Sequence, residues 1–407
     1  MTGTLERGRM RVAGFADPEM EYQLIRQLGA ARYGGAAIGE CLMLAQRIES
    51  GVPASWVDAF AAAAARQQAD AEQRAARGHA VSAHDAWLVA SNSWRAAEYY
   101  SAISDPRHRQ YGLASRACFL AAMKHGPWRC EELSLDCDGR ALPAYYLSAA
   151  DADAPGRTLM IVSGYDGTLE ETYLGYGRAA LERGYRLLLF TGPGQMDTLR
   201  FHDGLCFIPE FERIGTPAVE HLLTRAQTDP ARIALMGISF GGYFATRIAV
   251  HEPRIRALIP NSPIVDLHAY MASFVGFDPA QMPDADDFRA ADLDHIPDHV
   301  MPPQAREMSR NLILRIGGTS FKDTYRRLRA FRVEAAQLAT LRCAALALVG
   351  SGEGREPLAQ YERFVASVPG ASGHLFGADE GADGHCQAGN LAHSAAVSMD
   401  WLDDVLA

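Results

Sequence analysis

The sequence lacks the features of a membrane protein, a secreted protein and a nucleic-acid-binding protein. No run of about eighteen apolar residues, the length that a membrane-spanning helix needs, occurs in it. Its first residues carry charges but no apolar core followed by small residues, so they do not predict a secretion signal. The formal net charge is −10 without a basic cluster, which argues against nucleic acid as a partner. We expect a cytoplasmic protein that acts on a small molecule and contacts neither membrane nor nucleic acid.

Cysteine is scarce, and its spacing is irregular. The chain of 407 residues has seven cysteines, an odd number, and no two of them form a C-x-x-C pair. Such a pattern predicts neither a disulfide framework nor a metal site, because both need cysteines at paired and close spacings. The sequence therefore favours a reduced protein with no bound metal.

What the sequence does contain is a change of pattern near residue 128. Residues 18–126 are rich in alanine and show helical periodicity. From Glu131 onward, short apolar runs alternate with helix-like segments, which predicts a mostly parallel sheet covered on both faces. We expect an N-terminal helical domain over 1–127 and an α/β catalytic domain over 128–407, with a helical cap insertion at 267–335. The alanine-rich helix faces are compatible with a homodimer.

The most informative stretch is RIALMGISFGGYFATRIAV, where Ser239 stands between two glycines. An apolar run precedes it, and a helix-like segment with one apolar face follows it. A serine at such a strand-to-helix junction takes strained backbone angles, and Gly237 and Gly241 give it room. The context favours a nucleophile over a serine that only caps a helix.

A serine nucleophile needs a histidine to take its proton and an acid to orient that histidine. The loop after the apolar run AALALVG offers Glu353 and Glu356, and Asp379 follows the next short run. We assign the acid to Glu353, with Glu356 and Asp379 as the alternatives. The base is assigned to His385 in the loop EGADGHCQAGN.

Two other histidines fit the role of base less well. His374 falls inside a strand pattern, and His393 falls well into the closing helix. A tetrahedral intermediate also needs two backbone N–H donors for its oxyanion. We expect them at Phe240, directly after the nucleophile, and at Tyr165 in the turn SGYDG, although glycines there would also suit an ordinary turn.

Taken together, SGYDGTLEE, LLLFTGPGQ, GISFGGYFA and DGHCQAGN resemble the α/β-hydrolase superfamily, in particular its FrsA-like esterase branch. That branch includes 2,6-dihydroxypseudooxynicotine hydrolase and fungal hydrolases that shorten polyketide chains. The resemblance covers residues 130–406. It implies an α/β-hydrolase fold and hydrolysis of a carbon–carbon bond next to a carbonyl, without a cofactor. It places the triad on Ser239, Glu353 and His385.

Two residues depart from the pattern of that branch. The acid of the triad is usually aspartate there, whereas Glu353 is longer by one methylene group. The residue after GPGQ is often glycine but is Met196 here, which implies a more apolar pocket.

The sequence therefore predicts a serine hydrolase that cleaves a 1,3-dicarbonyl or acyl-aromatic, polyketide-like compound. The same triad would serve an esterase, a thioesterase or an acyltransferase, and a catalytically inactive binding protein on this fold is a further alternative. The pocket is expected between the N-terminal helices and the sheet, with the 267–335 insertion as its roof. The aromatic residues expected to line it are Trp87, Trp94, Tyr99, Tyr100, Tyr270, Phe274 and Phe277.

Overall fold

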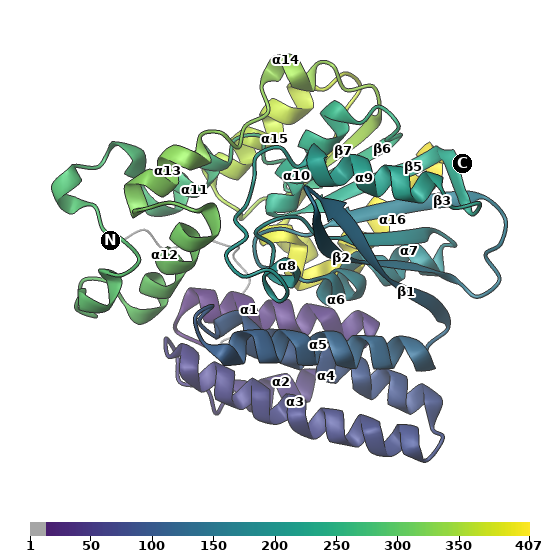
Figure 1. The fold of residues 1–407 in the computed structure, drawn as a ribbon, viewed down its shortest axis with the longest axis horizontal. Coiled ribbons are helices and arrows are strands. Elements are labelled where there is room, and N and C mark those ends of the chain that lie inside the picture. Colours follow the sequence, from purple (N-terminus) through teal and green to yellow (C-terminus); the bar gives the residue numbers. More distant parts are fainter. Residues whose placement is uncertain (1–13) are drawn as a thin grey trace.

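The computed structural model describes residues 14–407, which form an eight-stranded sheet with helices on both faces (Figure 1). The strands are β1 (Trp128–Cys137), β2 (Arg140–Ala149), β3 (Gly156–Val162), β4 (Arg186–Phe190), β5 (Thr228–Ile238), β6 (Ala257–Asn261), β7 (Ala344–Gly350) and β8 (Ser372–Phe376). Their order across the sheet is β1-β2-β4-β3-β5-β6-β7-β8. The β1–β2 and β2–β4 pairs are antiparallel and all other pairs are parallel, which confirms the predicted α/β class.

The helices fall into three groups along the chain. The N-terminal group is α1 (Pro18–Gly29), α2 (Ile38–Ala45), α3 (Pro53–Ala76), α4 (Ala80–Tyr100) and α5 (Pro106–His125). The helices between and after the strands are α6 (Leu169–Thr172), α7 (Arg178–Glu182), α8 (Met196–Leu199), α9 (Glu212–Leu223), α10 (Phe240–His251), α15 (Arg355–Ser367) and α16 (Leu391–Val405). The segment between β6 and β7 holds α11 (Leu267–Val275), α12 (Pro303–Ile316), α13 (Phe321–Leu328) and α14 (Ala335–Leu338).

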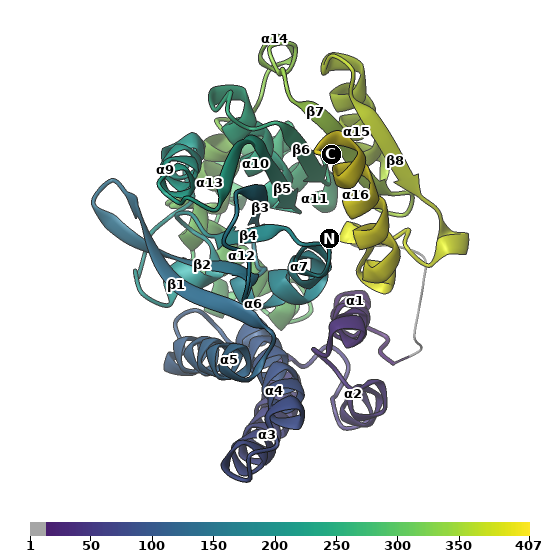
Figure 2. The ribbon, with the colours of Figure 1, turned by 90° about the vertical axis from the view of Figure 1, so that its right-hand side faces the viewer.

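The central strands are buried on both faces, as a parallel sheet requires. Along β3, Met160 and Val162 belong to an apolar core that also contains residues of α9 and α10. Leu159 and Ile161, which point to the opposite face, belong to a second core with residues of α4, α5, α7 and α16. Figure 2 shows α10 and α16 on different sides of the sheet. Because β3 to β8 run in the same direction, the loops that follow them, described below, emerge at one edge of the sheet.

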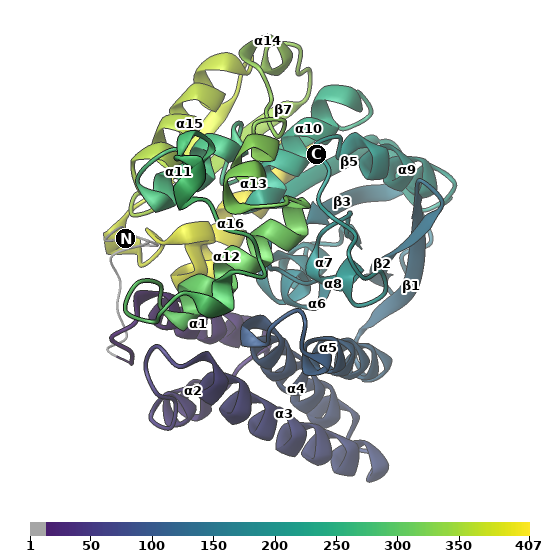
Figure 3. The same ribbon diagram turned by 60° about the vertical axis from the view of Figure 1, so that its left-hand side comes forward.

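The N-terminal helices lie against one side of the sheet layer, and Figures 1 and 3 show α12 close to α1. Helix α5 ends at His125 and β1 begins at Trp128, close to the expected boundary. The assignment of two separate domains stays a prediction. Within residues 14–407, no helix combines the length and the apolar character that crossing a membrane requires.

One fully buried arginine joins the N-terminal helices to the rest of the fold. The guanidinium group of Arg200 contacts three buried carboxylates, those of Glu98 on α4, Glu170 on α6 and Asp197 on α8, at 2.6–3.1 Å. Burial is the largest influence on the pKa of Asp197 and raises it well above its usual value, although Arg200 acts in the opposite direction. Arg200 is the cation that these three carboxylates share, so their burial depends on its charge.

We expect Arg200→Met to destabilise the protein by about 3–5 kcal/mol, since it leaves buried carboxylates without their cation. Chemical denaturation or a shift in melting temperature measures the change. The matched control is Arg74→Met, which breaks an exposed pair with Asp70 and should leave the melting temperature close to that of the wild type. Equal melting temperatures for both variants would show that the buried cluster does not stabilise the packing of α4 against α6 and α8.

Candidate active site

Ser239 lies at a sharp turn between β5 and α10. Its backbone has φ 59° and ψ −124°, a left-handed conformation that strains any residue with a side chain. A Cβ atom on Gly237 would overlap the carbonyl oxygen of Gly241, and one on Gly241 would overlap the carbonyl oxygen of Val162. Both glycines are therefore required by steric contact, and the turn holds the Ser239 hydroxyl at the carboxyl end of the sheet.

The structure brings Ser239, His385 and Glu353 into one chain of hydrogen bonds. His385 Nε2 lies 2.9 Å from Ser239 Oγ, and His385 Nδ1 lies 2.6 Å from Glu353 Oε2. The Gly350 N–H donates to Glu353 Oε1 at 2.9 Å, and the Ser262 hydroxyl donates to Oε2 at 2.7 Å. These bonds hold the carboxylate in one orientation, so that the imidazole presents Nε2 to the serine. The catalytic roles of the three residues stay predictions.

The alternative acids and histidines lie elsewhere. Glu356 accepts a hydrogen bond from a glutamine on its own helix, and Asp379 lies in a short turn after β8. His374 on β8 and His393 on α16 lie beside Glu380, with His393 Nε2 3.0 Å from a Glu380 oxygen. The ligand atoms of His374, Glu380 and His393 lie within 4.8 Å of one another, so this partly exposed group could hold a metal ion away from Ser239.

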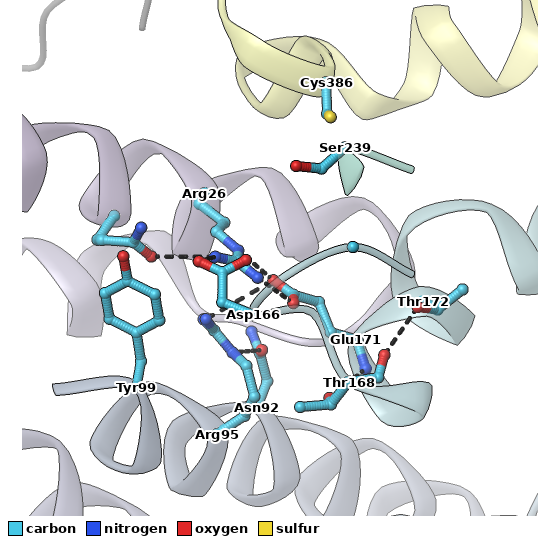
Figure 4. Close-up of polar contacts among 12 residues, drawn as sticks. Arg26, Asn92, Arg95, Tyr99, Asp166, Thr168, Glu171, Thr172, Ser239 and Cys386 are labelled. Atoms are coloured by element: carbon cyan, nitrogen blue, oxygen red, sulfur yellow. Dashed lines mark hydrogen bonds and ion pairs between the residues drawn. The ribbon is translucent and has the colours of Figure 1, made fainter. Parts of the chain in front are cut away.

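The surroundings of His385 change its proton affinity. Burial lowers the pKa of the imidazole, but interactions with Cys386 and Glu353 raise it by more, so that the pKa lies above its ordinary value. Cys386 Sγ lies 3.5 Å from His385 Nε2, the atom that also contacts Ser239 Oγ, and Figure 4 shows Cys386 beside Ser239. Sequence reasoning did not assign a role to Cys386, although its place in the GHC motif was the available signal.

One expected oxyanion donor, Phe240, lies at the turn, and the loop after β3, which carries the other, packs against it. A Cβ atom on Gly164 would lie 2.7 Å from Ser239 Cβ and 2.8 Å from the Phe240 nitrogen, so the loop after β3 packs directly against the turn. Among residues 14–407, neither the Phe240 N–H nor the Tyr165 N–H has a hydrogen-bond acceptor within the protein. Both donors are therefore available to an oxygen atom beside Ser239.

Gln195, the last residue of GPGQ, fixes the direction of one of these donors. Its side-chain amide is fully buried and donates to the carbonyl oxygens of Ser163 at 2.6 Å and Gly164 at 3.1 Å. The Gly164 carbonyl and the Tyr165 N–H belong to one trans peptide group, in which they point in opposite directions. By holding the carbonyl, Gln195 keeps the N–H on the other side. The sequence had suggested only that GPGQ shapes the pocket.

The segment between β6 and β7 reaches the same loop through α12. The guanidinium group of Arg315 donates to the carbonyl oxygens of Tyr165 and Gly194 and lies 3.8 Å from the centre of the Tyr165 ring. Arg315 thus holds the loop after β3 against the loop after β4. This contact joins residues far apart in the sequence, and no motif predicted it.

A cleft of about 700 Å³, which includes space open to solvent, borders Ser239. Its walls come from α1, the loop after β3, α6 with the turn that follows it, and the loop of His385. The expected place next to the N-terminal helices is therefore observed. The lining of this cleft differs from the expectation: of the described residues that line it, none is among the seven aromatic residues named from the sequence, and none lies in 267–335, although Tyr270 packs beside His385. Tyr22 and Arg26 of α1 line it instead, and no motif marks either residue.

Comparisons with known proteins show which proteins this chain resembles. A family model described as the prolyl oligopeptidase family matches residues 216–291, which contain the Ser239 turn. The alpha/beta hydrolase pydG of Acremonium sp is 29% identical over 414 residues, which cover 94% of this chain and 95% of that protein. The crystal structure of 2,6-dihydroxy-pseudo-oxynicotine hydrolase superposes with a TM-score of 0.71 over 93% of this chain and 95% of that one, at 19% identity. The chain has the α/β-hydrolase fold and is similar in sequence to proteins that are named as hydrolases.

These similarities confirm the resemblance that the sequence motifs indicated. The hydrolyase poxO of Penicillium oxalicum is 32% identical over 274 residues, and the match spans 64% of this chain and 64% of that relative. The chain thus covers just under two thirds of that relative's length. The match to 2,6-dihydroxy-pseudo-oxynicotine hydrolase extends over the N-terminal helices as well, so the protein shares the fold of both its sheet and its helical segment with a known structure.

The pH dependence of kcat/KM should follow His385. The imidazole accepts the serine proton only when it is neutral. Its pKa is raised above the ordinary value of about 6.5, so activity should fall as the pH drops through this raised pKa. Glu353→Gln removes a charge that raises this pKa, so the acidic limb should move to lower pH while the rate falls by about 10⁴. Glu356→Gln is the control. With an activated ester as substrate, the acidic limb of its pH–rate profile should stay at the wild-type pH. If the acidic limb of Glu353→Gln stayed at the wild-type pH, the assignment of Glu353 as the acid would be contradicted.

Gln195→Met should lower kcat on an activated ester by about 10–100-fold with little change in KM, since a misplaced oxyanion donor weakens only the transition state. Gln360 provides a matched control, because it is equally buried and also bonds backbone groups, at the start of α11. We expect Gln360→Met to keep the wild-type kcat. If both variants lost kcat to a similar extent, or if only KM changed in Gln195→Met, the role of Gln195 in orienting the oxyanion donor would be contradicted.

Proposed function

We propose that this protein is a serine hydrolase that cleaves a carbon–carbon bond in a 1,3-dicarbonyl or acyl-aromatic compound of polyketide type. The observation that carries the proposal is the hydrogen-bonded series Ser239–His385–Glu353 at a strained turn with two open backbone donors. The sequence resemblance to hydrolases of carbon–carbon bonds supports the choice of bond. A structurally similar protein that is named as a hydrolase of 2,6-dihydroxy-pseudo-oxynicotine supports a small-molecule substrate.

The geometry supports a two-step reaction. His385 Nε2 takes the proton of Ser239 while Oγ attacks the substrate carbonyl, and the Phe240 and Tyr165 N–H groups donate to the resulting oxyanion. The oxyanion collapses, the carbon–carbon bond breaks, and the leaving enolate carbon receives the proton from His385. Water then gives a proton to His385 and attacks the acyl group on Ser239, which releases a carboxylic acid and restores the serine.

The covering of His385 supports cleavage with a carbon leaving group. The His385 side chain is 8% exposed, and the ring centres of Tyr22 and Tyr270 each lie 6.4 Å from the centre of its ring. The Tyr22 hydroxyl donates to the His385 carbonyl oxygen at 3.1 Å, which fastens α1 over this loop. With bulk water kept from the imidazole, its proton is directed to the leaving carbon.

The proposal predicts that the wild type converts benzoylacetone to a ketone and a carboxylate, and that Ser239 reacts with a fluorophosphonate. Ser239→Ala should lose both properties, with a rate at least about 10⁴-fold lower, because the nucleophile itself is removed. Chromatography of the products and mass spectrometry of the labelled peptide measure the two effects. Its melting temperature checks that the variant is folded.

Two results would contradict this proposal in different ways. If Ser239-dependent hydrolysis occurs with p-nitrophenyl acetate but no diketone is cleaved, the protein is an esterase with the same triad. If Ser239→Ala keeps the wild-type rate and the wild type takes no label, the nucleophile is another residue.

A further inference from the structure

Across from Ser239, the cleft is lined by a group of charged side chains. Arg26 of α1 forms two hydrogen bonds to the Glu171 carboxylate, at 2.6 and 2.5 Å, and a third to Asp166 at 3.2 Å. All three side chains line the cleft and stay partly exposed, at 12% for Arg26, 24% for Asp166 and 18% for Glu171. Figure 4 shows this group across from Ser239 and Cys386. A ligand that reaches Ser239 therefore meets charged groups at its other end.

The charges in this group balance one another. Arg95 of α4, which is 2% exposed, lies 3.7 Å from Glu171, so two guanidinium groups face the carboxylates of Asp166 and Glu171. Burial raises the pKa of Glu171, but Arg26 and Arg95 lower it by more, which keeps the carboxylate ionised. Among residues 14–407, the two guanidinium groups of this cluster are matched by its two carboxylates, so a carboxylate on the substrate would face two like charges. The group suits an uncharged ligand.

The chemistry of Arg26 and Asp166 narrows the ligand further. A guanidinium group only donates hydrogen bonds, and an ionised carboxylate only accepts them. One hydroxyl group can satisfy both, because its oxygen accepts while its O–H donates. An enol or a phenol does this well, since its O–H is more acidic than that of an aliphatic alcohol. A methyl ether cannot, because it has no proton to donate.

From this arrangement we infer that Arg26 and Asp166 form a subsite for an uncharged enol or phenol hydroxyl group, on the part of the substrate remote from the scissile carbonyl. The inference rests on the proposed function, which places that carbonyl at Ser239. Arg26 donates to the hydroxyl oxygen, and Asp166 accepts its proton. The helix α1 thus contributes substrate selection as well as covering His385.

The test measures binding rather than turnover, so that it does not depend on the chemical step. Ser239→Ala is titrated calorimetrically with three probes: 3-hydroxybenzoylacetone, its methyl ether, and 3-carboxybenzoylacetone. We expect the hydroxyl compound to bind about 10- to 100-fold more tightly than the ether, as for the loss of a hydrogen bond to a charged group. The carboxylate should bind more weakly than the ether. Equal affinities for hydroxyl and ether, or tightest binding of the carboxylate, would overturn the inference.

Variants in the Ser239→Ala background show whether the named residues cause the discrimination. Arg26→Gln and Asp166→Asn should each reduce the preference for the hydroxyl probe to within about threefold. The matched control is Arg247→Gln, which breaks a bidentate pair with Glu212 of similar exposure outside the cleft and should keep the full preference. A preference retained in both cleft variants, or lost equally in the control, would overturn the assignment.

The same probes distinguish failure of the subsite from failure of the proposed function. If Ser239→Ala prefers the hydroxyl probe but the wild type cleaves none of the diketones, the subsite stands and the proposed reaction is wrong. If the wild type cleaves the hydroxyl probe and the ether with equal kcat/KM and equal affinity, the reaction stands and the subsite is wrong.

Discussion

The whole site depends on one close backbone contact at the carboxyl ends of β3 and β5. Gly164 packs so tightly against Ser239 and the Phe240 nitrogen that a single added carbon would collide with them, and Gly237 and Gly241 leave no more room. The strained Ser239 conformation is kept by this packing, since a residue with a side chain would otherwise leave the left-handed region. The contact also places the Tyr165 peptide group beside the serine. Ser239 and the two backbone N–H groups that are predicted to bind an oxyanion are thus fixed by the same constraint.

Side chains from distant segments maintain that contact. Gln195 holds the carbonyl oxygens of the loop after β3, and Arg315 of α12 ties this loop to Gly194. Arg200 anchors α4 to α6 and α8, the helices that follow the two loops. Each of these side chains is buried, so its polar atoms must all find partners inside the protein. Because these polar groups are fully hydrogen-bonded, the loops that they join can adopt few other conformations. The Phe240 and Tyr165 N–H groups are therefore held in place before a substrate binds.

The N-terminal helices are part of the site as well as of the core. Through Tyr22, α1 bonds the backbone of His385, and through Arg26 it completes a balanced group of charges at the end of the cleft. The insertion at 267–335, expected as the roof, instead acts through Arg315 on the loop beside Ser239 and through Tyr270 on His385. Helix α1 and the 267–335 insertion therefore both contact the loops that hold Ser239 and His385.

The sequence by itself determined the parallel sheet, the turn at Ser239 and the order of serine, acid and histidine. These features are local: apolar runs specify buried strands, glycines permit a left-handed turn, and loops after parallel strands meet at one edge. Only the tertiary structure decided that Glu353 rather than Glu356 faces the imidazole, and that Tyr22, Arg26, Gln195 and Arg315 surround the site. The physical reason is that these contacts join segments far apart in the chain. Their partners are set by how helices pack on the sheet, and neither periodicity nor motif spacing records that packing.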